Sequence, residues 1–407
     1  MRRSIFKVHT SRIKTPVVFK SSMVPTIAQF ASIFFFITVL TSDQVASGSA
    51  TSSPNSLSRI YHIMGQGIST SQWFVYGRRN FTQNGYLRHV KNYNSPVQSR
   101  ADICRGAEGA DGVDMGGKCV VVTGANSGLG KQVATYAASK GANVYMICRS
   151  KERGEKARTE IIESTSNQNV KILLADVGEL SQVKSAVEEL QSNESQVDCL
   201  VCNAGVLLNE KQVTSTGTET TIASHLIGGS YLLTKLLTPQ LEASAANGKD
   251  PRVIFITSGG MYLTKMPSWD VATSTAQGQK YDPVMAYAHA KRGQVILAEE
   301  LAKQNNGITY MTAHPGWSDT ASVDDAFGSN KKYLEPLRTT WAGAEGITWL
   351  LHAKKQILQN GSFYLDRMIE PKHLSGPFMT EGKFTKNTKS EISTFMQNLN
   401  VESKFEN

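Results

Sequence analysis

Tyr287 and Lys291 are four residues apart in the stretch Tyr287-Ala-His-Ala-Lys291. In a helix this spacing puts the phenol and the ammonium on one face, one turn apart. A nearby lysine charge favours the phenolate and is expected to lower the pKa of the tyrosine. A tyrosine of this kind exchanges a proton with an alcohol near neutral pH. The same pattern also arises by chance on surfaces, so its context decides its meaning.

A glycine-rich turn lies upstream, at Thr123-Gly-Ala-Asn-Ser-Gly-Leu-Gly130. It follows an apolar strand and opens a helix pattern, which is the context that a dinucleotide-binding turn requires. Glycine lets the backbone approach a phosphate, and the helix N-terminus offers free N–H groups to the pyrophosphate. The turn predicts cofactor contacts at Gly124, Asn126, Ser127, Gly128, Leu129 and Gly130.

Arg149 ends the second apolar run, directly after Cys148. Sites for NAD usually have an acidic residue at this position, which contacts the ribose hydroxyls. An arginine there can instead pair with the 2′-phosphate of NADP, and Lys131 and Arg153 add positive charge nearby. We therefore expect NADP(H) to be favoured over NAD(H). A solvated Arg149 without a ligand is the alternative.

Apolar strands alternate with helix patterns from Lys118 onward, and each strand is apolar throughout. This alternation predicts an α/β fold with one doubly wound parallel sheet, covered by helices on both faces and preceded by an N-terminal extension. Strands are expected at 119–123, 143–148, 170–174, 198–202, 252–256, 308–313 and 362–365. Helices are expected up to 140 and near 152–165, 180–192, 219–242, 284–304 and 343–354.

The positive charge is concentrated in the first 100 residues, which hold 12 basic residues and one acidic residue. The remaining 31 basic and 33 acidic residues give no basic face for nucleic acid. A basic segment at 1–23 and an apolar run at 24–40 favour a targeting or anchor segment, hence a membrane-associated or organellar protein. Signal peptide, signal-anchor, mitochondrial transit peptide and disordered tail all remain open. A flexible Ser/Thr-rich linker follows at 41–58.

Aromatic and basic residues are interleaved at 72–95. They predict either a membrane-surface helix or an arm that packs its aromatic side chains on the folded body. The expected organisation is an anchor and linker at 1–60, this arm at 61–115, a catalytic domain at 116–375 and a C-terminal tail at 376–407.

The chain has five cysteines, and Cys199-Leu-Val-Cys202 matches C-x-x-C. In a strand, residues three apart point to opposite faces, and no second C-x-x-C completes a zinc site. We therefore expect no metal, and interpret the pair as small buried hydrophobic residues.

Taken in order, the motifs resemble the short-chain dehydrogenase/reductase family of the classical type, over about 116–370. The resemblance implies a Rossmann-type fold and an NAD(P)-dependent oxidoreductase that interconverts an alcohol and a carbonyl on a small molecule. It implies Ser258, Tyr287 and Lys291 as catalytic residues, with Tyr287 as the general acid/base. Further cofactor contacts are implied at Asp176, Val177, Asn203, Ala204, Gly205, Pro315, Gly316 and Thr320, and at Tyr287 and Lys291.

A narrower resemblance is to the branch called dehydrogenase/reductase member twelve, through His314-Pro-Gly-Trp317, Phe363-Tyr-Leu-Asp-Arg367 and the arm. Substrate selection is expected in segments 260–283 and 317–340. The large side chains there indicate a hydrophobic substrate or, alternatively, packing: Met261, Tyr262, Trp269 and Trp317. Family members commonly pair through the fourth and fifth helices, so the resemblance leaves open a homodimer or a membrane-anchored monomer.

One departure concerns the fourth helix, where the family often has an Asn that completes a proton relay. This chain has Ala223-Ser-His-Leu-Ile-Gly-Gly-Ser-Tyr231 instead, and His225 or Ser224 is the nearest candidate. A packed histidine without a relay role is the alternative. The difference also keeps open a dinucleotide-binding scaffold or sensor with little turnover.

Overall fold

The structure, a computed structural model, describes residues 54–93, 112–304, 306–320, 323–324, 328–376 and 380–405, with the first helix's side chains from residue 67 onward. The chain divides into units at residues 1–54 and 55–407, and the second is described below. The apolar run at 24–40 lies outside the described residues. Among the helices that are described, none is long and apolar enough to cross a membrane.

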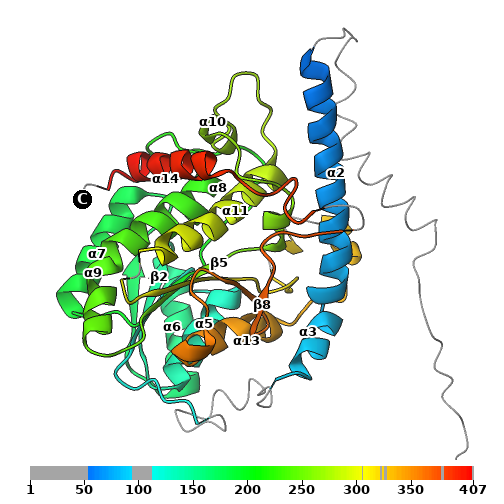
Figure 1. Cartoon of the computed structure of the whole chain (residues 1–407). Coiled ribbons are helices and arrows are strands. Elements are labelled where there is room, and N and C mark those ends of the chain that lie inside the picture. The colour runs from blue at the N-terminus through cyan, green and yellow to red at the C-terminus, as the bar shows by residue number, and fades with distance from the viewer. Residues whose placement is uncertain are drawn as a thin grey trace, which may run out of the picture. The chain divides into compact units, whose positions relative to one another are not determined.

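An eight-stranded sheet forms the centre of the fold, in the order β3-β2-β1-β4-β5-β6-β7-β8 (Figure 1). All neighbouring pairs are parallel except β7 and β8, which are antiparallel. The predicted doubly wound α/β sheet is confirmed. The strands are β1 (Cys119–Thr123), β2 (Asn143–Cys148), β3 (Val170–Leu174), β4 (Cys199–Cys202), β5 (Arg252–Ile256), β6 (Thr309–Ala313), β7 (Phe363–Leu365) and β8 (Met368–Glu370).

Helices cover both faces of the sheet because its central strands are buried throughout. α5 (Gly128–Ser139), α6 (Lys151–Thr165) and α13 (Thr340–Leu350) pack on one face. α7 (Leu180–Asn193), α9 (Leu233–Ala246), α11 (Pro283–Ala302) and α14 (Lys389–Ser403) pack on the other. Cys199 and Cys202 enter opposite cores, as their spacing predicts. Shorter elements are η2 (Gly259–Tyr262), α10 (Trp269–Ala272), η3 (Gly328–Tyr333) and η4 (Lys355–Ile357).

The fourth helix differs from the expected regular α-helix. α8 (Thr220–Ile222) continues into a π-helical segment, η1 (Ala223–Leu232), and then into α9. Two glycines permit the close packing of this wide turn. A Cβ on Gly228 would lie 2.0 Å from the Val177 carbonyl oxygen, and one on Gly229 would lie 1.9 Å from that of Ser224. The hydrophobic pattern of the sequence does not reveal either of these close backbone contacts.

α14 lies within the segment that was predicted as a C-terminal tail. A capping box at Thr388 and Glu391 starts this helix, and Phe395 and Leu399 are buried in the core. Tyr231 on η1 donates to the Asn400 side chain at 3.1 Å. α14 therefore occupies part of the fourth-helix surface through which a homodimer was expected. The homodimer and the domain boundaries stay predictions.

The aromatic arm packs on the folded body, which decides between its two predicted roles. Its helices are α2 (Pro54–Asn80) and α3 (Gln83–Val90). Phe81 is fully buried, and its ring lies 5.7 Å from that of Trp317 and 4.3 Å from that of His314. The Trp317 amide donates to the Phe81 carbonyl oxygen at 2.8 Å. The arm thus packs directly against the loop after β6.

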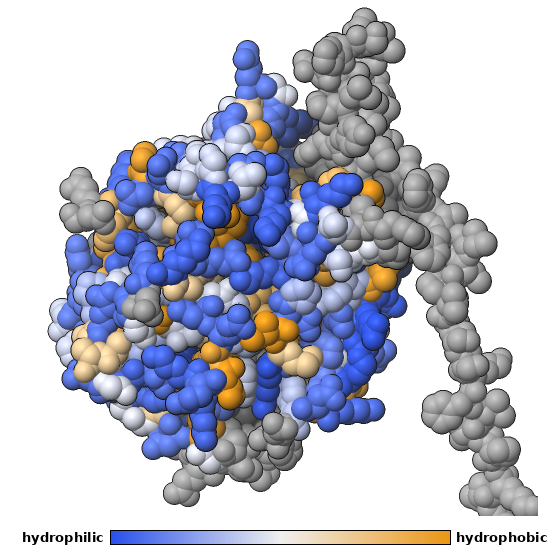
Figure 2. Space-filling view, in the orientation of Figure 1, coloured by the Kyte–Doolittle hydropathy of each residue, from blue (hydrophilic) through white to orange (hydrophobic). Residues whose placement is uncertain are grey.

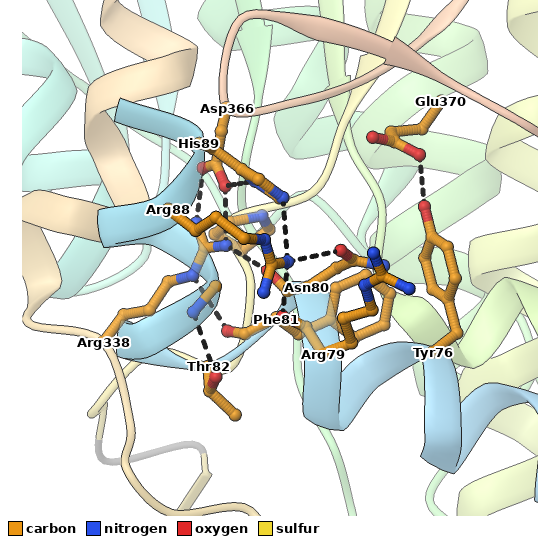
Figure 3. A network of polar contacts seen from close by, with 12 residues as sticks. Tyr76, Arg79, Asn80, Phe81, Thr82, Arg88, His89, Arg338, Asp366 and Glu370 are labelled. Carbon is orange, nitrogen blue, oxygen red and sulfur yellow. Dashed lines mark hydrogen bonds and ion pairs between the residues drawn. The ribbon is translucent and has the colours of Figure 1, made fainter. Parts of the chain in front are cut away.

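A buried polar network fastens the arm to the turn between β7 and β8 (Figure 3). Arg338 donates to both Asp366 carboxylate oxygens and to the backbone carbonyls of Asn80 and Phe81. The His89 ring Nδ1 lies 2.8 Å from the same Asp366 carboxylate. Tyr76 also donates to Glu370 on β8. Arm and body therefore form one packed unit over the described residues.

The molecular face drawn in Figure 2 is mostly hydrophilic, with hydrophobic residues in small separate groups. The exposed large hydrophobic side chains come from many different elements, which is ordinary for a folded domain. We assign no docking role to this face. 

Candidate active site

The glycine-rich turn between β1 and α5 has the backbone geometry that its sequence predicts. Gly124 and Gly128 adopt φ values of +65° and +53°, which favour glycine. A Cβ on Gly130 would lie 2.4 Å from the Gly124 carbonyl oxygen. Asn203 holds the turn because its Nδ2 donates to the Thr123 carbonyl oxygen at 2.9 Å.

The N-terminus of α5 meets the conditions for a pyrophosphate. A Cβ on Gly128 would lie 3.9 Å from Thr320 Cγ2 and would meet no closer atom of the described residues. Ser127 makes no side-chain cap hydrogen bond, so the first N–H groups of α5 are not taken by its hydroxyl. Free N–H groups and the helix dipole stabilise an anion at such an end. The residues present therefore fit a dinucleotide.

The other predicted cofactor residues follow the carboxyl ends of neighbouring parallel strands. These ends share one edge of the sheet, where α/β folds bind nucleotides. They are Arg149 after β2, Asp176 and Val177 after β3, Asn203, Ala204 and Gly205 after β4, and Pro315, Gly316 and Thr320 after β6; Asn126 and Leu129 lie in the turn after β1 and at the start of α5.

Arg149 is accessible for a phosphate, with 59% of its side chain exposed. Its nearest anion is the Asp176 carboxylate, at 3.5 Å, and an exposed pair of this length contributes little. Lys131, in contrast, pairs with Glu160 on α6. Of these two cations, Arg149 is thus the more available to bind a phosphate.

α11 carries the tyrosine and the lysine to the same sheet edge. Asp282 caps this helix by accepting from the Met285 amide at 3.0 Å, and Pro283 occupies its first turn. Ser258 lies just after β5, and Tyr287 Cδ1 lies 3.5 Å from where a Gly260 Cβ would be. Lys291 Nζ lies 5.4 Å from the Tyr287 ring centroid. The structure thus brings the three predicted catalytic residues together.

The pKa of Tyr287 differs from the expectation that Lys291 would lower it. Burial raises it above its ordinary value, although a hydrogen bond with Ser258 lowers it in part. The predicted lowering by Lys291 was wrong for this geometry, because Lys291 Nζ donates to the Ile256 carbonyl oxygen at 2.6 Å and to Gln294 Oε1 at 3.2 Å. Burial also lowers the pKa of Lys291 to about 7. The phenol is therefore protonated at neutral pH.

His225 occupies the position beside Tyr287 where the sequence lacks the expected Asn. Its Nε2 lies within hydrogen-bonding distance of both the amide and the carbonyl oxygen of Val206, at 2.9 and 2.8 Å. Burial and then the Lys291 charge hold the pKa of His225 well below its usual value. The ring is therefore neutral near pH 7. Ser224, the other candidate, is buried on the same segment.

The segments expected to select the substrate contribute mainly packing. Met261, Tyr262 and Trp317 are buried in a cluster with Phe81, and Trp269 packs against Phe395. Packing, one of the two alternatives, thus describes these side chains. The sequence placed Trp73 and Phe74 in the aromatic arm but did not identify Trp317 as their partner, because Trp317 lies more than 200 residues away.

Comparison with known proteins identifies the family. A family model described as short chain dehydrogenase matches residues 118–269. Dehydrogenase/reductase SDR family member 12 of Homo sapiens is 33% identical over 304 residues, which cover 74% of this chain and 89% of the human protein. The chain belongs to the short-chain dehydrogenase/reductase family. Retinol dehydrogenase 12 of Homo sapiens is 36% identical over 207 residues, covering 50% of this chain and 62% of that protein.

Two solved structures share the fold of this chain. An uncharacterised protein of Mycobacterium paratuberculosis aligns with a TM-score of 0.52 and 22% identity, over 72% of this chain and 96% of its own. A short-chain dehydrogenase of Escherichia coli in complex with NADPH aligns with a TM-score of 0.50 and 19% identity, over 66% and 100% of the two chains. Family membership makes this chain an NAD(P)-dependent oxidoreductase that acts on a small molecule.

Proposed function

We propose that this chain reduces a carbonyl group on an apolar small molecule with NADPH. The observation that supports this most directly is the grouping of Ser258, Tyr287 and Lys291 at the sheet edge that also carries the glycine-rich turn. Because burial raises the Tyr287 pKa, its phenol holds a proton at neutral pH. A protonated phenol is the form that donates to a carbonyl oxygen, which is the proton transfer that carbonyl reduction needs.

Each residue then has a separate role in the proposed reaction. Tyr287 donates its proton to the carbonyl oxygen, and the Ser258 hydroxyl donates a hydrogen bond to the same oxygen as it gains charge. Lys291 supplies the neighbouring positive charge. The turn at 124–130, Asn203 and Thr320 would hold the dinucleotide, which supplies the hydride.

NADP(H) preference is proposed from Arg149. Its guanidinium is exposed at the end of β2, and the weak contact with Asp176 leaves it available to pair with a 2′-phosphate. The family alone does not distinguish between NAD and NADP. The preference therefore depends on this residue.

An apolar substrate is proposed from the partly buried aromatic rings of the arm. Trp73 Nε1 would lie 2.7 Å from a Gly259 Cβ, directly after Ser258. The Trp73 ring lies 5.6 Å from that of Trp317 and is edge-on to it. Two relatives are named retinol dehydrogenase 11 and 12, so retinal is a reasonable probe.

The test uses the purified chain with NADPH and a panel of retinal, a steroid ketone, and aliphatic and aromatic aldehydes, followed at 340 nm. We expect oxidation of NADPH with at least one apolar carbonyl. Tyr287→Phe should lower kcat by at least about a hundredfold and leave the NADPH dissociation constant nearly unchanged. Retained turnover in Tyr287→Phe would remove the tyrosine from its role.

A dinucleotide-binding scaffold with little turnover is the second candidate, and the altered fourth helix favours it. η1 has neutral His225 where the family often has an Asn. The presence of Ser258, Tyr287 and Lys291 together argues against this candidate, because binding alone needs none of their acid/base chemistry. Tight NADPH binding without oxidation across the whole panel would favour the scaffold.

A further inference from the structure

The side chain of Gln294 lies between the catalytic helix and the fourth helix. Lys291 Nζ donates to Gln294 Oε1 at 3.2 Å. Gln294 Nε2 in turn donates to the backbone carbonyl oxygen of His225 and to Ser230 Oγ, both at 3.0 Å. The Ser230 hydroxyl donates to the same carbonyl at 2.6 Å. One amide group thus joins Lys291 on α11 to η1.

The orientation of this amide follows from its partners. An ammonium has only donors and a backbone carbonyl has only acceptors, so Oε1 must face Lys291 and the amide nitrogen must face His225. Lys291, Gln294 and Ser230 are 3%, 1% and 0% exposed. Buried polar groups depend on such partners because water does not replace them. The amide therefore has one arrangement in which both of its ends are satisfied.

The surroundings of Lys291 provide no anion to stabilise its charge. Four titratable groups lie around it in the described part of the chain: Cys202 on β4, His225 on η1, His314 after β6 and Tyr287 on its own helix. Burial raises the pKa of Cys202 to about 12 and keeps that thiol neutral. Burial also lowers the pKa of His314 to about 3. The Lys291 ammonium is thus held by two neutral oxygen atoms, those of Ile256 and Gln294.

We propose that Gln294 is a positioning residue of this site, whose amide sets where the Lys291 ammonium lies relative to η1 and keeps it charged. The effect of Gln294 on catalysis rests on the proposed function, because the charge of Lys291 matters for turnover only if Tyr287 transfers a proton. The structural part of the proposal, the control of Lys291 by Gln294, stands without turnover.

Removal of the amide oxygen should lower the Lys291 pKa. Burial favours the neutral amine and an acceptor oxygen favours the ammonium, so the loss of one acceptor moves the balance toward the amine. Gln294→Met has similar length and no polar atom, and we expect its Lys291 midpoint to fall by about one unit from the value near 7. Gln294→Glu adds a negative charge at the same place, and its midpoint should rise.

The measurement is an NMR titration of the full chain labelled with [ε-¹³C]lysine, in which Lys291→Arg identifies the Lys291 resonance by its loss. Ile296→Val is the matched control, because it removes one methyl group from the same helix without touching the amide. An unchanged midpoint in folded Gln294→Met, or a shift of equal size in Ile296→Val, overturns the proposal. If Gln294→Met does not fold, an unraised midpoint in Gln294→Glu overturns it.

A kinetic measurement then separates this proposal from the proposed function. With an accepted carbonyl, Gln294→Met should lose kcat/KM at pH 8 about tenfold more than at pH 5.5, since one pKa unit changes the charged fraction about tenfold above the midpoint. Equal losses at both pH values would indicate a merely structural role and overturn the catalytic meaning. If no carbonyl is reduced at all, the proposed function fails while the NMR midpoints still decide what Gln294 does.

Discussion

The rings of His225 and Tyr287 meet edge-on, with 5.3 Å between their centroids and an interplanar angle of 88°. Gly205 makes room for this contact, because a Cβ there would lie 1.8 Å from His225 Cε1. The last glycine of Asn203-Ala-Gly205 therefore admits the histidine ring, in addition to its predicted cofactor contact. The His225 ring thus lines the site next to the Tyr287 phenol.

The first prediction is that His225 stays neutral through the physiological range. Burial and the nearby Lys291 charge both favour the neutral imidazole, so its folded pKa lies well below the usual value. A ¹⁵N-histidine NMR titration should show the ¹⁵N shifts of a neutral imidazole, with no protonation of this ring, between pH 5.5 and 8.5, with His225→Gln used to identify its signals. A midpoint between 6 and 7 would instead support a proton relay through His225.

The second prediction concerns cofactor choice. Arg149→Asp should lower the affinity for NADPH at least about tenfold and leave that for NADH equal or better, because a carboxylate repels the 2′-phosphate and accepts from the ribose hydroxyls. Dissociation constants follow from fluorescence titration with both cofactors. Lys151→Asp, two residues further on and exposed, is the charge-matched control. If the ratio of the NADPH and NADH dissociation constants is unchanged in Arg149→Asp, Arg149 does not determine the cofactor preference.

The third prediction compares two adjacent glycines. A Cβ on Gly259 would lie 2.7 Å from Phe81 Cε2 and from Trp73 Nε1, whereas one on Gly260 has its nearest neighbour at 3.5 Å. Gly259→Ala should therefore displace the arm and lower the free energy of unfolding by about 1–3 kcal/mol. Gly260→Ala should have much less effect on stability. Urea unfolding measures both, and equal midpoints would mean that the arm does not press on this turn.

The fourth prediction concerns acid. Burial alone would raise the pKa of Asp366, but the Arg338 guanidinium and the His89 contact hold it below its usual value. A depressed carboxyl contributes stability that is present above the unfolded value of about 3.9 and is lost as the pH falls through the folded pKa. The arm should therefore lose amide-exchange protection below about pH 4, before the sheet does.

Asp366→Asn tests the same contact at neutral pH. Loss of the charge from a buried pair costs about 3–5 kcal/mol, so this variant should expose residues 67–93 to exchange at pH 7. Asp319→Asn, whose partner Lys331 is a surface residue, is the control and should change little. Full protection of the arm in Asp366→Asn would contradict the role given to the network.

The sheet and the grouping of the predicted site were visible in the sequence because they depend on local patterns. Apolar runs predict β1 to β7, and the glycine-rich turn must follow a strand. Once the strands are parallel, their carboxyl ends share one edge, so Asn203 after β4 and Ser258 after β5 come together without further information.

What the sequence did not reveal depends on partners far along the chain. A buried Arg338 is indistinguishable from a solvated one until Asp366 is known to face it. The raised pKa of Tyr287 depends on its burial by other elements. The role of Gln294 is recognisable only once η1 is known to place the His225 carbonyl oxygen beside its amide. β8 escaped prediction because its three residues, Met368–Glu370, are not fully buried and form no apolar run, unlike the equally short β7.

The turn at Asp366 and Arg367 has a consequence for the order in which the chain matures. Both residues have positive φ, at 51° and 66°, a backbone that persists only when surrounding contacts enforce it. Asp366 lies 277 residues after His89, so the arm leaves the ribosome long before its partner exists. The ion pairs that fasten the arm therefore cannot form until residue 366 has been made. A chain truncated before residue 366 would lack the carboxylate that Arg338 and His89 share, and its arm would be held by ring packing and by hydrogen bonds to backbone carbonyls, without this ion pair.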